Sequence, residues 1–89
     1  MQDDKTLADV IAIIGKFSER KDAVAAADAS TRILDLGVSS LNFIEMIVRL
    51  EETFNISISD DEFQKITTVG EAVAAIQLAQ AAAASQATA

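Results

Sequence analysis

A serine stands where a new helix is expected to begin, directly after a glycine that permits a sharp turn. The run reads Asp35-Leu36-Gly37-Val38-Ser39-Ser40-Leu41. The first amides of a helix have no partner within the helix, and the helix dipole is positive there, so an anion is stabilised at that end. Ser40 is therefore suited to carry a phosphate ester on its hydroxyl, and Ser39 is suited to cap the helix.

Other side chains that commonly do chemistry are missing. The 89 residues include no cysteine and no histidine, which excludes disulfides, thiolate metal sites, cysteine nucleophiles and the commonest general base. Carboxylates are abundant, but runs of charge usually form solvated faces, and no nucleotide-binding loop accompanies them. We therefore expect no catalytic residue and no metal site, and a self-contained enzyme has little support.

The charge restricts the partners as well. Fourteen acidic residues against seven basic ones give a formal net charge of -7. Nucleic acid and anionic membrane surfaces both attract basic proteins, so neither is expected as a partner. Partner surfaces rich in lysine and arginine are favoured instead. The acidic N-terminus, and the lack of a strongly apolar stretch of about 20 residues, predict a cytoplasmic protein without a membrane span.

The composition predicts one helical domain. Hydrophobic residues make up 51% of the chain and aromatic residues only 4%, with no proline and three glycines, which disfavours a turn-rich β architecture. A first helix is expected over residues 4–18, where apolar residues recur at helical spacing. They are Leu7, Val10, Ile11, Ile14 and Phe17. Residues 20–36 are expected to form a long connection with room for one helical turn, closing at Ile33, Leu34 and Leu36.

The helix that starts at Ser40 is expected to end at Phe54 and has apolar residues on two faces. At about 100° per residue, five of them form a core stripe. This stripe consists of Phe43, Met46, Ile47, Leu50 and Phe54. The opposite face carries an apolar strip beside two glutamates, which a helix with a single apolar face would not need. We call these residues the outer strip: Leu41, Ile44 and Val48 with Glu45 and Glu52.

Two capping boxes place the remaining helices. In each, a hydroxyl residue is followed three residues later by a glutamate: Ser59 with Glu62, and Thr68 with Glu71. The first predicts a short helix over residues 60–65.

The second capping box predicts a last helix that opens near Val69. After Leu78 the sequence is mostly alanine, which buries almost no surface. We therefore expect a domain over residues 1–78 and a frayed tail over residues 79–89. The fold class is all-α: a small four-helix bundle with three main helices, one short helix and a long loop between the first two main helices.

Three motifs, in this order, resemble those of the acyl carrier proteins. The first is the run from Asp35 to Leu41, followed by Glu45 in the helix and by Leu50-Glu51-Glu52-Thr53-Phe54 at its end. The second is Ile56-Ser57-Ile58-Ser59-Asp60, and the third is Lys65-Ile66-Thr67-Thr68-Val69-Gly70. The resemblance covers about half of the chain, while the first helix agrees only in position and pattern.

The resemblance implies that Ser40 is modified. A separate phosphopantetheinyl transferase would transfer 4′-phosphopantetheine from coenzyme A to the Ser40 hydroxyl, and the thiol of this arm would carry acyl groups as thioesters. An imported thiol fits a chain without cysteine. The resemblance further implies a monomeric carrier that serves acyltransferases, ketosynthases or related enzymes of fatty-acid, lipid or polyketide biosynthesis through their basic docking surfaces.

The two faces of the helix then have different expected roles. The outer strip is expected to contact partner enzymes, and the core stripe is expected to line a cavity that shelters the acyl chain. Phe43 follows Ser40 by three residues and is expected near the mouth of that cavity.

Several positions depart from the family pattern. Asn42 stands where an acidic residue usually follows the Ser-Leu pair, Arg49 adds a positive charge to the helix, and Ser59 replaces a common proline. Either a specialised carrier or ordinary surface drift explains these changes. Two other functions also stay open: a carrier of aminoacyl or peptidyl groups, and an unmodified acidic interaction module of the same fold.

Overall fold

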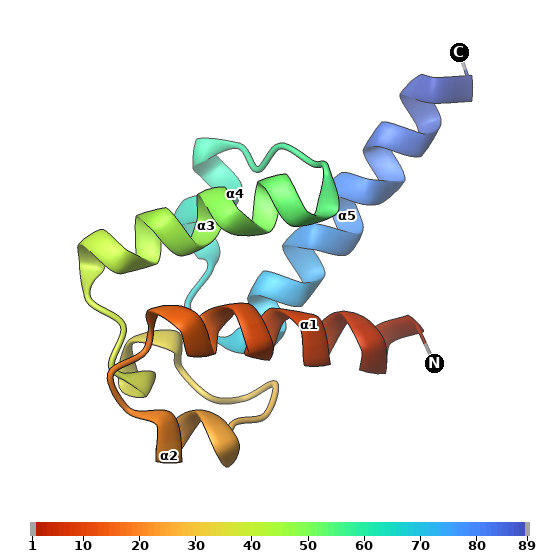
Figure 1. Cartoon of the computed structure of the whole chain (residues 1–89). Coiled ribbons are helices and arrows are strands. Elements are labelled where there is room, and N and C mark those ends of the chain that lie inside the picture. The colour runs from red at the N-terminus through yellow and green to blue at the C-terminus, as the bar shows by residue number, and fades with distance from the viewer. Residues whose placement is uncertain (1, 89) are drawn as a thin grey trace.

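Three long helices, α1 (Gln2–Phe17), α3 (Ser40–Phe54) and α5 (Val69–Thr88), form a bundle in which α1 packs against both α3 and α5 (Figure 1). The computed structural model describes the backbone of residues 2–88 and the side chains of residues 5–82. The expected all-α fold is confirmed.

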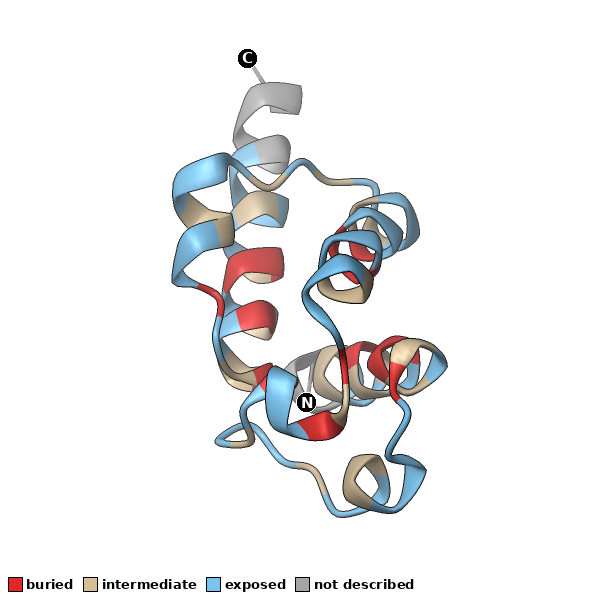
Figure 2. Cartoon of the chain, turned by 90° about the vertical axis from the view of Figure 1, so that its left-hand side faces the viewer, coloured by how far each residue is buried: buried red, intermediate tan, exposed pale blue. Residues whose placement is uncertain are grey.

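The core lies where the three long helices face one another (Figure 2). Its largest fully buried side chains come from every long helix and from the loop between α1 and α3. They are Val10, Ile14, Ile33, Leu36, Met46, Leu50, Val69 and Ile76. Full burial of one such side chain stabilises a fold by about 1.5–3 kcal/mol. An aliphatic core of this kind fixes the position of α3.

The first helix spans Gln2–Phe17 rather than the expected 4–18. Ser18 leaves the helix because its buried hydroxyl takes other partners: it donates to the Leu36 carbonyl and accepts from the Arg20 amide at 2.9 Å. The end of α1 is thereby tied to the loop that precedes α3.

The long connection contains two short helices, α2 (Lys21–Ala25) and the 3-10 helix η1 (Ile33–Leu36). The expected single helical turn is therefore an underestimate. Ile33 and Leu36 are buried in the core, as expected for residues that close the loop. Leu34 is 59% exposed, so its predicted closing role is wrong; a helical turn directs it away from its two buried neighbours.

Residues 29–33 of this connection pair with residues 67–70, far away in the sequence. The Ile33 amide donates to the Thr67 carbonyl at 3.0 Å, and the Val69 amide donates to the Thr31 carbonyl at 2.9 Å. Arg32 and Thr68 form an isolated β-bridge. These bonds fasten the start of α5 to the segment that leads into α3.

Both predicted capping boxes find support. The Ser59 hydroxyl accepts from the Glu62 amide at 3.2 Å at the start of α4 (Asp60–Lys65), which has the predicted bounds. The Thr68 hydroxyl accepts from the Glu71 amide at 3.2 Å, and a Glu71 carboxylate oxygen accepts from the Thr68 amide at 2.9 Å. These caps satisfy amides that have no partner within the helix.

The last helix does not end at Leu78, where we placed the boundary between domain and tail. It continues through the alanine-rich segment to Thr88 and extends beyond the other helices (Figure 1). Alanine has the highest helix propensity, which favours this continuation even without burial. Fraying of this end stays a prediction. Among the described residues, no helix is both long and apolar enough to cross a membrane.

Candidate functional site

Ser40 is the first residue of α3, and its side chain is exposed. Ser39 caps the helix: its hydroxyl accepts from the Asn42 amide at 3.1 Å. The Ser39 carbonyl accepts from the Phe43 amide at 2.7 Å, which starts the helical ladder. The amides of Ser40 and Leu41 make no hydrogen bond to another described residue. The hydroxyl of Ser40 is therefore accessible beside two amides that can bind an anion.

The turn before this serine is fixed on both sides. Gly37 has φ 76°, in the left-handed region that favours glycine, and its carbonyl accepts from the Glu19 amide at 3.1 Å. Val38 is buried in the core. The Asn42 side-chain amide on α3 donates to the carbonyl of Phe17, the last residue of α1, at 3.4 Å. These contacts position Ser40 against the end of α1.

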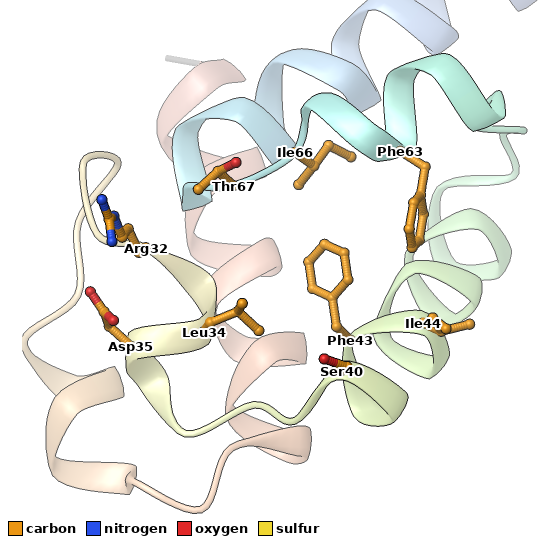
Figure 3. A pocket seen from close by; sticks show the side chains of 9 residues that line it. All are labelled: Arg32, Leu34, Asp35, Ser40, Phe43, Ile44, Phe63, Ile66 and Thr67. Carbon is orange, nitrogen blue, oxygen red and sulfur yellow. The ribbon is translucent and has the colours of Figure 1, made fainter.

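An open pocket of about 480 Å³ lies beside Ser40 (Figure 3). Its wall comes from η1 and the residue before it, from the start of α3, and from α4 with the two residues after it. The lining residues are Arg32, Leu34, Asp35, Ser40, Phe43, Ile44, Phe63, Ile66 and Thr67. Because Ser40 forms part of the wall, a group attached to its hydroxyl starts at the pocket itself.

Two phenyl rings stand at one side of the pocket. Phe43 from α3 and Phe63 from α4 meet edge to face, with ring centroids 5.3 Å apart and planes at 65° (Figure 3). This geometry matches the favoured arrangement of aromatic pairs. The pair bridges α3 and α4 in the pocket wall, and the expected place of Phe43 at the mouth of an acyl cavity stays a prediction.

The predicted cavity residues do not all meet at this pocket. Phe43 lines it, whereas Met46, Ile47 and Leu50 are buried in the core and Phe54 is partly buried against it. The periodicity of α3 predicts which residues turn inward, but it does not distinguish a packed core from the wall of a hollow. A direct role of the four other residues toward an acyl chain stays a prediction.

The outer strip lies on the exposed face of α3, as predicted from its spacing. Leu41, Ile44 and Val48 are 68%, 50% and 47% exposed. Glu45 and Glu52 are exposed beside them. A second, smaller hollow of about 280 Å³ is lined by all of the strip except Leu41, together with Phe17 and Arg49. Ile44 also borders the larger pocket, so the strip and the pocket meet at this residue.

Sequence reasoning missed most of the pocket wall. The missed residues belong to two separate stretches that only the folded chain brings together with the start of α3: Arg32, Leu34 and Asp35, and Phe63, Ile66 and Thr67. Two motifs of the resemblance pointed to this region: the first motif begins at Asp35, and the third, Lys65 to Gly70, contains Ile66 and Thr67.

Comparison with known proteins agrees with this geometry. Residues 8–76 match the sequence profile described as phosphopantetheine attachment site. The chain belongs to the acyl carrier protein family. The profile spans most of α1, the connection after it, α3, α4 and the first turns of α5. The family therefore covers the whole site, and a phosphopantetheine arm is the group expected there. An acyl carrier protein is a carrier, which implies a non-catalytic role.

Individual relatives support the family. An acyl carrier protein of Wolinella succinogenes is 46% identical over 56% of this chain and 66% of its own length. One from Sinorhizobium fredii is 42% identical over 67% of this chain and 77% of its own length. For the first relatives compared, the match spans only 60% to 66% of the relative's length.

A solved structure shares the fold. It is the hexanoyl form of the acyl carrier protein from the actinorhodin polyketide synthase of Streptomyces coelicolor, with a TM-score of 0.75 and 27% identity. The similarity covers 85% of this chain and 91% of the other.

Proposed function

We propose that this chain carries acyl groups as thioesters on a 4′-phosphopantetheine arm attached to Ser40. The observation that supports this most directly is the place of Ser40: exposed, at the first turn of a helix, and in the wall of a pocket within the matched phosphopantetheine domain. The chain itself has no thiol, and the arm supplies one.

The surroundings of Ser40 fit a phosphate ester. The first turn of α3 contains no acidic side chain that would repel it. The amides of Ser40 and Leu41 have no acceptor among the described residues, and the helix dipole favours a negative charge at this end. The Ser39 hydroxyl is already engaged by the Asn42 amide, so Ser40 is the better candidate of the two serines.

The pocket gives the carrier a place to shelter its cargo. Leu34, Phe43, Phe63 and Ile66 offer it an apolar surface next to the attachment point. An alkyl chain that leaves water gains about 0.8 kcal/mol per buried methylene group, so part of a bound chain is retained there rather than in solvent.

Partner enzymes dock, in this proposal, on the outer strip. Its three exposed aliphatic side chains share one face of α3 with the exposed Glu45 and Glu52, and the chain carries a net charge of -7. Such a surface complements a partner with an apolar contact surrounded by lysine and arginine. The phosphopantetheinyl transferase is the first partner required, and acyltransferases or ketosynthases follow.

Loading in vitro tests the attachment. The protein is incubated with coenzyme A and a broad-specificity phosphopantetheinyl transferase, and its intact mass is measured. We expect the wild type and the Ser39→Ala variant to gain the mass of one arm, and the Ser40→Ala variant to gain nothing.

The opposite pattern of the two variants would move the attachment to Ser39. If none of the three proteins gains mass, the chain is an unmodified interaction module of the same fold. An arm that accepts aminoacyl but not acyl groups from loading enzymes would favour the alternative of an aminoacyl or peptidyl carrier.

A further inference from the structure

The pocket beside Ser40 is not uniformly apolar, and its polar residues are concentrated at the end away from the serine. Figure 3 shows Arg32 and Asp35 side by side at one end, with Ser40 and Phe43 at the other. Leu34 lies between them. An acyl chain that enters the pocket from the side of Ser40, at the end of its arm, and crosses this apolar middle therefore reaches charged groups at the far rim.

Arg32 is held at that rim by its backbone while its side chain is available. Its carbonyl accepts from the Asp35 amide at 3.1 Å, and it forms the β-bridge with Thr68. Its guanidinium makes no hydrogen bond or ion pair with another described residue. Arginine keeps its charge at any physiological pH and offers five N–H donors. These donors need acceptors when a chain covers them, because a covered polar group without a partner costs free energy.

Asp35 decides between the acceptors that could satisfy Arg32. Its carboxylate lies beside the guanidinium in the pocket wall and offsets part of the positive charge. A cargo that ends in a carboxylate would be repelled by Asp35. A neutral oxygen is not repelled by Asp35. A ketone oxygen can accept a hydrogen bond from Arg32, and a hydroxyl group can in addition donate one to Asp35.

We propose that this pocket selects acyl chains that carry ketone or hydroxyl groups toward their far end, and that Arg32 binds those oxygens. This inference rests on the proposed attachment at Ser40. Arg32 acts here as a residue that determines specificity, through the contents of the pocket rather than through partner docking.

The test compares cargoes that differ by one oxygen. Octanoyl, 5-oxooctanoyl and 7-oxooctanoyl pantetheine arms are loaded onto the wild type and onto Arg32→Met, and intact mass confirms loading. We expect at least one oxo cargo to raise the melting temperature of the wild type by roughly 2–4 °C more than octanoyl, an effect smaller than that of one fully buried hydrogen bond. The Arg32 Nε–H signal should also shift in NMR spectra with that cargo and not with octanoyl.

In Arg32→Met the difference between oxo and plain cargo should vanish, while the stabilisation by octanoyl persists. Arg49→Met is the matched control: it removes an exposed arginine that pairs with Glu52 on α3, at 3.9 Å, and should keep the difference. Equal melting temperatures for all loaded wild-type forms, or an oxo effect that survives in Arg32→Met, would overturn the selection while leaving the carrier function intact. Failure of every arm to load on Ser40 would overturn both.

Discussion

Among single residues, Gly37 matters most for the placement of Ser40. Its φ of 76° is strained for any residue with a side chain, and an added Cβ would lie 2.8 Å from Arg20 Cγ and 3.1 Å from the Arg20 nitrogen. We expect Gly37→Ala to lower the free energy of unfolding by about 1–3 kcal/mol, because the left-handed conformation and the close approach both oppose a methyl group. Urea unfolding followed by circular dichroism measures this.

Gly15→Ala provides the control. Gly15 lies inside α1, and its added Cβ would make an ordinary contact of 3.5 Å with Val24 Cγ1. This variant should be stabilised by up to about 1 kcal/mol, the gain of alanine over glycine in a helix. Two variants of equal stability would contradict the role given to Gly37.

Phe43 links the attachment site to the pocket. Its ring packs edge to face on Phe63 and is partly buried. We expect Phe43→Ala to destabilise the empty carrier by about 2 kcal/mol, less than for a fully buried phenylalanine. A long acyl chain that fills the gap should recover part of this loss, which thermal melts of the bare and acylated forms would show. Equal stabilisation of wild type and variant by the chain would mean that Phe43 is only a packing residue.

At the scale of elements, the two faces of α3 separate docking from stability. Ile44 is half exposed in the outer strip, and Ile47, three residues later, is only 4% exposed. Ile44→Ala should slow loading by the transferase and leave the melting temperature nearly unchanged. Ile47→Ala should cost about 2–5 kcal/mol, the range for buried large-to-small changes. Transferase kinetics and thermal melts measure both effects.

Salt gives a second check on the outer strip. Because the strip has a glutamate rim, the loading rate should fall as ionic strength rises and screens the attraction to a basic partner. Two results would contradict a docking role of the outer strip. One is a large loss of stability in Ile44→Ala, and the other is a loading rate that changes neither with salt nor with this substitution.

The start of α5 makes the stability of the bundle depend on pH. A Glu71 carboxylate oxygen accepts from the Thr68 and Thr67 amides, and these bonds lower the pKa of Glu71 below its ordinary value of 4.5. Since the folded-state pKa lies below the unfolded one, the carboxylate stabilises the fold above the unfolded pKa. This contribution is lost as pH falls from about 4.5 through the folded-state pKa.

The melting temperature of Glu71→Gln should therefore lie below that of the wild type at pH 7. The difference between the two melting temperatures should become smaller as the pH drops below 4.5. Glu45→Gln on α3 is the control, since Glu45 is exposed and its side chain makes no hydrogen bond or ion pair with another described residue. Melting curves between pH 7 and pH 3 would detect the effect. A difference in melting temperature between the wild type and Glu71→Gln that stays constant across this pH range would show that the Glu71 charge does not stabilise the cap.

At the scale of the whole molecule, patterns within a few residues of sequence predicted the helices, whereas contacts between distant segments were not predicted. Spacing and capping residues gave α3, α4 and the start of α5, because a cap depends on residues three positions apart. The pairing of residues 29–33 with 67–70 depends on chain segments that meet only after folding. No periodic pattern marks it.

The site divides in the same way. Ser40 and the outer strip follow from the local sequence, because a helix start and exposure on a helix face are local properties. The pocket wall does not, since η1, α3 and α4 each contribute to it. Helical periodicity therefore placed Met46 and Leu50 correctly inside and could not tell that they fill the core rather than line the pocket.

The most direct test is the intact mass of the protein purified from its native host, followed by peptide mapping. The account predicts a chain heavier by one phosphopantetheine arm, with part of the population heavier again by an acyl group, and both additions on the peptide that contains Ser40. A host-derived chain with the unmodified mass, or an arm mapped to any other residue, would contradict it.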